Sequence, residues 1–126
     1  MTGDARILVL MATYNGQAHL AEQLDSIFDQ EGVEVTLRVS DDCSTDNTFR
    51  ILETYAAEHE NLEIIYNTAH KGKTRTLMKL VYEAPVEEYD FIALANQDDV
   101  WHPGKLAAGT DHISANTSRP ELYYAG

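Results

Sequence analysis

Two pairs of adjacent carboxylates, Asp41-Asp42 and Asp98-Asp99, are the residues of this sequence whose types and spacing best suit chemistry. The first pair follows the apolar run Val35–Val39, and the second follows the apolar run Phe91–Ala95. Carboxylates held together repel one another unless something neutralises them, and a divalent cation commonly does so. If both runs are strands, the pairs predict carboxylates gathered at one edge of a sheet.

Alternating strand and helix patterns run along the whole chain and must position these acids. Residues 7–12 form a continuous apolar run typical of a buried parallel strand, whereas Leu20, Leu24, Ile27 and Phe28 recur at helical spacing. The same patterns predict strands at residues 6–12, 35–40, 62–66, 89–95 and 122–125, with helices at about 17–29, 49–56, 73–84 and 103–114.

Such alternation implies an α/β fold in which a mostly parallel, doubly wound sheet lies between two layers of helices. With a strand order of 3-2-1-4, strands 2 and 4 flank strand 1, and their following loops meet at the carboxyl edge, where such sheets bind ligands. Residues 13–15, 41–42 and 98–99 then face one crevice. We expect residues 1–126 to form a single domain.

Composition narrows the class of protein. A chain with 44% hydrophobic and 24% charged residues is ordinary for a globular protein, and a net charge of −12 disfavours nucleic acid as a partner. The longest apolar run is too short to span a bilayer, and no signal peptide is visible. The single cysteine, Cys43, excludes an internal disulfide and is compatible with the cytoplasm.

Basic residues are unevenly placed, because Lys71, Lys73, Arg75 and Lys79 fall within one short stretch. A basic patch beside paired acids fits an anionic ligand that also carries a metal. A solvated helix face explains the same charges equally well at this point.

Several nucleotide-binding classes lack their motifs here. No G-x-G-x-x-G follows the first strand and no P-loop is present, which disfavours dinucleotide-binding and P-loop proteins. A receiver domain is excluded because Thr13-Tyr14 and Asn67-Thr68 stand where its acidic residues belong.

The chain resembles the family 2 glycosyltransferases, which use nucleotide-sugar donors and have an A-type α/β fold. Four segments carry the resemblance, in order and at the usual spacing: MATYNG, VSDDCSTDNT, NTAHKGKTR and NQDDVWHPGKL. The QDDVW form is most similar to members that transfer rhamnose. Two positions depart from the family pattern: Asn96 stands where many relatives carry the first Asp of D-x-D, and Cys43 stands where Gly is common.

The resemblance implies roles for individual residues at the nucleoside. Asp42 accepts a hydrogen bond from the ring N–H of uracil or thymine, although capping of the following helix, for which Ser44 and Asp46 are better placed, is its alternative role. Asp41 has two open roles, a functional one at the site and orientation of the loop alone. The residues implied along the base and ribose are Ala12, Thr13, Tyr14 and Asn15, with packing as the alternative for Tyr14.

Further roles concern the diphosphate and the metal. Asp98 contacts the ribose or the metal, Asp99 binds the metal, and Asn96 hydrogen-bonds the ribose. Oxygen ligands and phosphate suit Mn²⁺ or Mg²⁺. Arg75, with Lys71 or Lys73, meets the diphosphate.

The implied reaction is transfer of a sugar, with inversion, from a UDP- or dTDP-sugar to an acceptor hydroxyl on a saccharide or a lipid-linked sugar in polysaccharide synthesis. The catalytic base is expected beyond Gly126, so the chain is expected to be the N-terminal, donor-binding part of a longer enzyme, truncated after strand 5. We expect such a fragment to self-associate, and the enzyme to be cytoplasmic or peripheral at the inner face of the membrane. A nucleotidyltransferase and a binding-only domain remain as alternatives.

Overall fold

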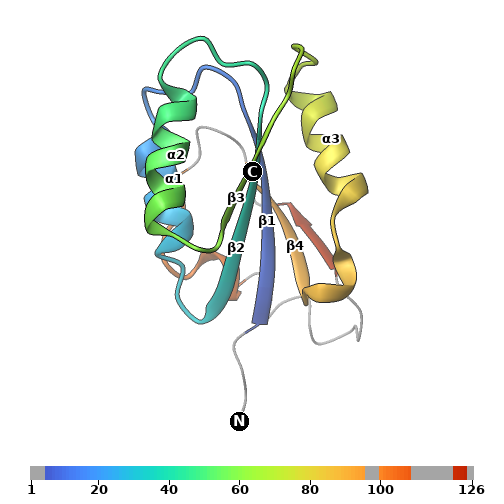
Figure 1. Cartoon of the computed structure of the whole chain (residues 1–126). Helices are drawn as coiled ribbons and strands as arrows, with labels where there is room; N and C mark the ends of the chain where they lie inside the picture. Colours follow the sequence, from blue (N-terminus) through green and yellow to red (C-terminus); the bar gives the residue numbers. More distant parts are fainter. Residues whose placement is uncertain (1–4, 96–99, 109–120, 125–126) are drawn as a thin grey trace.

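A parallel sheet forms the centre of the computed structural model, which describes residues 5–95, residues 100–108 and the backbone of residues 121–124. Figure 1 shows the elements in chain order. They are β1 (Ala5–Thr13), α1 (Leu20–Phe28), β2 (Val33–Asp41), α2 (Thr48–Glu58), β3 (Leu62–Tyr66), α3 (Lys73–Glu83), the 3₁₀-helix η1 (Val86–Glu88), β4 (Phe91–Ala95) and β5 (Glu121–Tyr124).

The order of the strands is β3-β2-β1-β4-β5, and every pairing between neighbours is parallel. The predicted order of 3-2-1-4 is therefore confirmed. Register places Thr13 opposite Asp41, Asp41 opposite Tyr66, and Met11 opposite Ala95. The carboxyl ends of four neighbouring strands thus lie together, and Asp41 stands between the ends of β1 and β3.

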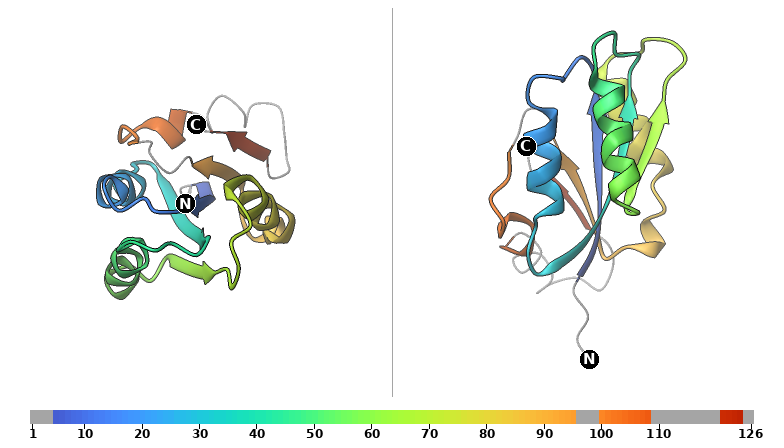
Figure 2. Two further views of the ribbon diagram at one scale, coloured as in Figure 1. Left: turned by 90° about the horizontal axis from the view of Figure 1, so that it is seen from above. Right: turned by 60° about the vertical axis from the view of Figure 1, so that its left-hand side comes forward.

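Helices cover both faces of the sheet, as the doubly wound prediction requires. Figure 2 shows α1 and α2 on one side of the strands and α3 on the other. Side chains of β1 alternate between two cores: Ile7 and Val9 pack beneath α1 and α2, whereas Leu8 and Leu10 pack beneath α3. All four are fully buried, which explains why the first strand reads as an unbroken apolar run.

Two predicted helix starts were too early. Helix α1 begins at Leu20 instead of Gln17, because the β2–α2 loop binds Gln17 through Asp46 and the Asn47 backbone. The helix predicted from Pro103 begins at residue 105, since residues 103–104 form a turn. Its predicted continuation to residue 114 lies outside the described residues beyond 108. No helix in the described part of the chain is long and apolar enough to cross a membrane.

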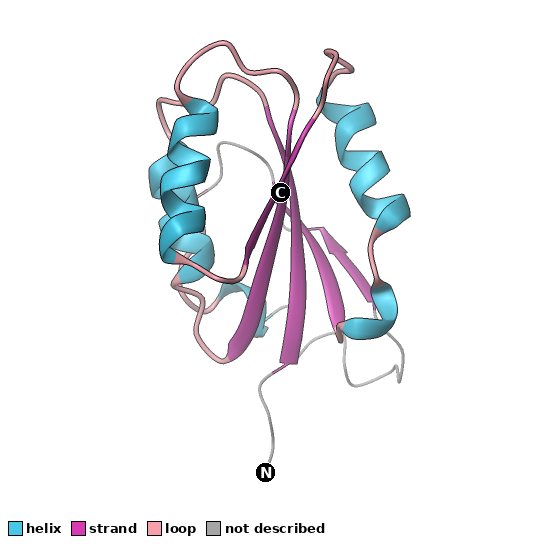
Figure 3. Ribbon diagram, in the orientation of Figure 1, coloured by secondary structure: helices cyan, strands magenta, loops and turns pink. Residues whose placement is uncertain are grey.

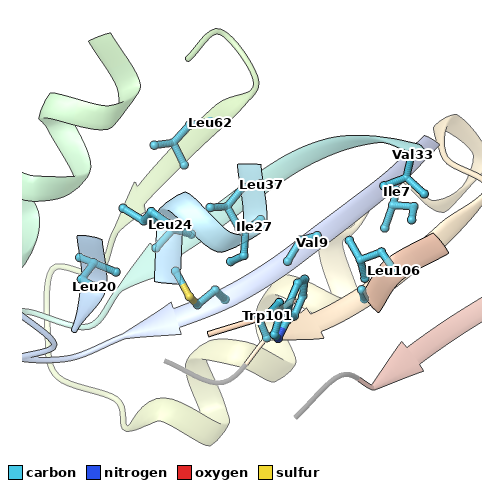
Figure 4. Packing of buried hydrophobic residues seen from close by; sticks show 14 of the residues in the cluster. Ile7, Val9, Leu20, Leu24, Ile27, Val33, Leu37, Leu62, Trp101 and Leu106 are labelled. Carbon is cyan, nitrogen blue, oxygen red and sulfur yellow. The ribbon is translucent and has the colours of Figure 1, made fainter. Parts of the chain in front are cut away.

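Buried polar side chains on α1 and just beyond its end hold residues 101–106. Ser26 Oγ accepts a hydrogen bond from the Trp101 backbone N–H. Gln30 is buried at the end of the same helix, where its Oε1 accepts from the Leu106 N–H and its Nε2 donates to the His102 carbonyl. Trp101 and Leu106 pack against the core formed by β1 and α1 (Figure 4). These contacts anchor the chain just beyond the predicted metal ligands.

Replacement of Gln30 by Met should destabilise the fold by about 2–4 kcal/mol, because a buried polar group left without its partner costs roughly 1–3 kcal/mol. Urea unfolding followed by circular dichroism measures the change. Gln17→Met is the matched control, since Gln17 is exposed. Equal losses in the two variants would contradict the anchoring role of Gln30.

Cys43 has a left-handed backbone, with φ at 61°. L-residues pay for this conformation whereas glycine does not, which gives a physical reason why Gly is common at this position in the family that the sequence resembles. The Cys43 thiol compensates in part by donating to the Asn67 carbonyl at 3.1 Å.

Cys43→Gly should therefore be more stable than Cys43→Ala by about 1 kcal/mol, because both variants lose the thiol contact but only the glycine relieves the backbone. Thermal unfolding of the two variants measures this difference. An alanine variant as stable as the glycine variant would refute the assignment of strain to this residue.

Candidate functional site

Three loops converge at the carboxyl edge of the sheet, where the sequence predicts the site. Figure 3 shows the loops after β1, β2 and β3 gathered at the upper end of the strands. Hydrogen bonds join them directly: the Asp42 N–H donates to the Thr13 carbonyl, and the Asn67 N–H donates to the Asp41 carbonyl. The backbone at the end of β2 therefore fixes the loops on either side.

Asp41 is a buried carboxylate that orients its surroundings, as the sequence suggests. Its Oδ1 accepts hydrogen bonds from Thr13 Oγ1 at 2.7 Å and from Ser44 Oγ at 2.6 Å, and its Oδ2 accepts from the Ser44 N–H. These contacts close the turn after β2 and bind it to the end of β1. Thr13, predicted to contact the nucleotide, thus directs its hydroxyl to Asp41.

Asp42 is fully buried and receives four hydrogen-bonding groups from the β3–α3 loop. Oδ1 accepts from Asn67 Nδ2 at 2.9 Å and from the Lys71 N–H at 2.8 Å. Oδ2 accepts from the Gly72 N–H at 2.8 Å and lies 2.9 Å from His70 Nδ1. A carboxylate offers about four lone-pair sites, so the loop occupies all of them. Asp42 does not cap α2: the N-cap residue is Asn47, and the Thr48 N–H at the start of the helix donates to Asp46 Oδ1.

These contacts keep Asp42 charged inside the protein. Burial alone raises the pKa of this carboxyl, but hydrogen bonds from Asn67, Lys71 and Gly72, together with the charge of His70, outweigh burial and hold the pKa below its ordinary value. Gly72 presents its N–H from a backbone with φ at 90°, which favours glycine at this position. The site therefore carries a fixed negative charge at neutral pH.

His70 covers the solvent side of Asp42. Its side chain is 57% exposed, and its ring lies against Tyr14 with a centroid separation of 4.7 Å and an interplanar angle of 51°. Tyr14 comes from the β1–α1 loop and is itself partly exposed. His70 therefore lies between the Asp42 carboxylate and the Tyr14 ring, which comes from a different loop.

The β1–α1 and β2–α2 loops hold one another through side chains. Asn15 Oδ1 accepts from the Thr45 N–H at 2.8 Å, and the Asn15 N–H donates to Ser44 Oγ. Asn15, predicted to bind nucleotide, is thus engaged by the neighbouring loop in this structure. Ala12, also predicted there, is buried at the end of β1.

The predicted basic residues lie at the start of α3. Lys71 precedes the helix, while Lys73 and Arg75 belong to its first turn, and all three side chains are exposed. The backbone N–H groups of Lys71 and Gly72 contact Asp42, so α3 begins at the same edge of the sheet as Asp42.

Three further predicted residues, Asn96, Asp98 and Asp99, lie outside the described residues. The strand that leads to them ends at Ala95, which pairs with Met11 near the end of β1. Among the residues that the structure does describe, no group of three or more His, Cys, Asp or Glu side chains could hold a metal. A metal at this edge therefore depends on the acids after β4.

Sequence reasoning missed the contributions of Asn67, His70 and Thr76. Asn67 Nδ2 bridges Asp42 and Thr76 Oγ1, each at 2.9 Å, and so ties the start of α3 to the end of β2. The available signal was the position of Asn67 directly after β3, at the same sheet edge as the acids. The partners of these side chains come from distant parts of the chain and cannot be read from local spacing.

A cavity lies at the opposite edge of the sheet, where the strands begin. This cavity of about 530 Å³ is bordered by Arg6, Val33, Glu34 and Tyr89, among others. It lies where β1 and β2 begin, and none of the residues predicted to bind ligand borders it. Ligands of doubly wound sheets bind at the carboxyl edge, so we place the candidate site there despite this cavity.

Known proteins share both the sequence and the fold. The chain is 34% identical over 110 residues to the dTDP-rhamnosyl transferase RfbG of Shigella flexneri, which covers 86% of this chain and 38% of that protein. The structure of S. aureus TarS 1-349 in complex with UDP has a TM-score of 0.72 at 28% identity, covering 85% of this chain and 32% of that one.

A mannosyltransferase from Pyrobaculum calidifontis, PcManGT, in complex with GDP-Man and Mn²⁺, gives a TM-score of 0.68 at 26% identity, covering 79% of this chain and 29% of that one. The chain thus spans 38%, 32% and 29% of the length of these three proteins. Residues 8–118 match the family model for glycosyl transferase family 2. From the extent of this match and the shared A-type fold, the chain belongs to glycosyl transferase family 2.

Proposed function

We propose that this chain is the donor-binding domain of an inverting glycosyltransferase that takes a UDP- or dTDP-sugar. The observation that carries the proposal is the charged, fully buried Asp42 at the carboxyl edge, whose partner His70 lies against the Tyr14 ring and whose loop leads into the basic start of α3. A ring platform, a buried acceptor and nearby cations suit the base and the diphosphate of a nucleotide sugar.

Asp42 and Tyr14 recognise the base in this proposal. An ionised carboxylate only accepts hydrogen bonds, so it selects a ring N–H donor such as those of uracil and thymine and disfavours cytosine, whose ring nitrogen accepts. RfbG and TarS, whose descriptions name dTDP-rhamnose transfer and UDP, support these two bases. Ala12, Thr13 and Asn15 build the loop that carries Tyr14 to this position.

The diphosphate lies between the acids after β4 and the start of α3. Asp99, with Asp98, supplies the carboxylate oxygens that suit Mn²⁺ or Mg²⁺, and the described residues add no competing cluster. When bound, the cation supplies Lewis-acid stabilisation of the departing diphosphate. Arg75 adds positive charge near the diphosphate, and Asn96 binds the ribose. Ser26 of α1 and Gln30, just after that helix, anchor the chain beyond the acids.

The acceptor and the catalytic base belong to the remainder of a longer enzyme in this proposal. A carboxylate base there removes the proton from an acceptor hydroxyl, whose oxygen attacks the anomeric carbon as the bond to the nucleoside diphosphate breaks, with inversion. The acceptor is a saccharide or a lipid-linked sugar, and the reaction belongs to polysaccharide synthesis at the cytoplasmic side of the membrane. We also propose that residues 1–126 form one domain, and that in isolation it self-associates.

A nucleotidyltransferase is the less favoured alternative. Such an enzyme normally carries a Gly-rich basic loop after the first strand, whereas residues 14–19 here contain one glycine and no lysine or arginine. A binding-only domain differs from the proposal only in the absence of transfer by the longer protein.

UDP or dTDP should bind far more tightly with Mn²⁺ or Mg²⁺ than with a chelator, because clustered acids repel a bare diphosphate. Unit charges about 4 Å apart repel by roughly 4 kcal/mol at an effective dielectric of 20. Isothermal titration calorimetry of the 126-residue chain measures both conditions, with GDP as a base control. Equal affinity for UDP or dTDP in the chelator would contradict the metal assignment.

Two substitutions should separate the roles of the acids. Asp42→Ala should weaken uridine or thymidine binding by roughly 1.5–3 kcal/mol, the value of a hydrogen bond to a charged group. Asp99→Asn should spare nucleoside binding and weaken metal-dependent binding of the diphosphate.

Asp29→Asn is the charge-matched control, because Asp29 is exposed at the end of α1, at the opposite edge of the sheet. Circular dichroism confirms that each variant remains folded. The division of roles is wrong if Asp42→Ala and Asp99→Asn reduce nucleoside affinity to the same extent.

A further inference from the structure

The imidazole of His70 lies where a nucleobase would have to lie to reach Asp42. Its Nδ1 is 2.9 Å from Asp42 Oδ2 and 3.4 Å from the Asp42 carbonyl oxygen, and its ring rests against that of Tyr14. A flat ring that presents an N–H to a buried carboxylate beside an aromatic side chain has the recognition features proposed above for uracil or thymine.

Asp42 has no lone pair left for a ligand while His70 is in place. Three of its four hydrogen-bonding partners, Asn67 Nδ2 and the Lys71 and Gly72 N–H groups, are built into the loop. His70 is the exposed fourth partner and contributes only a side chain, so a change of rotamer is enough to release it. Of these contacts, it is the easiest for a ligand to displace.

We propose that His70 closes the base subsite in the ligand-free chain and that the nucleobase displaces it from Asp42. This inference rests on the proposed function, because it assigns the vacated lone pair of Oδ2 to the ring N–H of the base. His70 thus competes with the base for Asp42, and this competition sets the affinity for the base. Histidine changes its charge between about pH 5 and pH 8.

The sign of the pH effect follows from the groups around His70. Asp42 faces it from the end of β2, Tyr14 faces it from the β1–α1 loop, and Lys71 adjoins it on its own loop. Imidazolium binds the Asp42 carboxylate more strongly than neutral imidazole does, since only the former adds an ion pair to the hydrogen bond. Protonation therefore holds the subsite closed, and the nucleobase binds more tightly as the pH rises.

Binding of uridine and thymidine to the 126-residue chain tests this competition, because these nucleosides carry no phosphate that titrates in the same range. Calorimetry should show about a two- to fivefold gain in wild-type affinity from about pH 5.5 to about pH 8, the scale of one half-exposed ion pair. His70→Gln should remove the pH dependence. His70→Ala should bind more tightly than wild type at the lower pH.

His59→Gln is the control, because His59 ends α2 and stacks on Phe28, away from the Asp42 loop. It should keep the wild-type pH dependence. A pH-independent wild type, or weaker binding by His70→Ala at the lower pH, would overturn the competition and leave base recognition by Asp42 standing. Absence of nucleoside binding at every pH in wild type and His70→Ala would overturn both proposals.

Nuclear magnetic resonance of the His70 ring gives a readout that is independent of affinity. Replacement of Asp42 by Asn removes the charge that His70 faces and should shift its ring proton signals in the ligand-free chain. Saturating nucleoside should shift the wild-type signals in the same direction, because both changes separate the imidazole from the carboxylate. Signals left unmoved by bound nucleoside would show that His70 stays on Asp42, which contradicts displacement.

Discussion

Burial of two adjacent negative charges at the end of β2 is the constraint on which the carboxyl edge depends. A carboxylate taken out of water is stable in its charged form only if hydrogen-bond donors replace the water. The chain supplies them from both sides, through Thr13 and Ser44 to Asp41 and through the β3–α3 loop to Asp42. Satisfying these charges therefore also fixes the three loops that border the site.

The same principle organises the other side of the edge. Ser26 and Gln30 place polar atoms inside the core, and their partners are backbone groups of residues 101–106. That segment follows Asp98-Asp99 in the sequence, so Ser26 and Gln30 fix the chain shortly after these acids. Within the described residues, the sheet and its loops thus bring the buried Asp42 and the basic start of α3 to a common edge.

Residue patterns predicted the strands and helices that follow from hydrophobic periodicity. They failed where contacts with distant residues determine the structure. The apolar run at residues 7–12 predicted β1, because a strand buried on both faces carries continuous apolar sequence, and the apolar Val35, Leu37 and Val39 predicted β2. The start of α1 was missed because the β2–α2 loop binds Gln17. The start of the helix after Pro103 was missed because residues 103–104 form a turn. The closure of Asp42 by His70 joins residues 28 positions apart, which no local spacing reveals.

A crystal structure of the chain grown with Mn²⁺ and UDP or dTDP tests the central claim most directly, because manganese is located by its anomalous scattering. We expect a manganese peak at the carboxyl edge, on Asp99 and the diphosphate, with the base against Tyr14 and its ring N–H on Asp42. A nucleotide bound instead in the cavity bordered by Arg6 and Tyr89, or a base that makes no contact with Asp42, would contradict it.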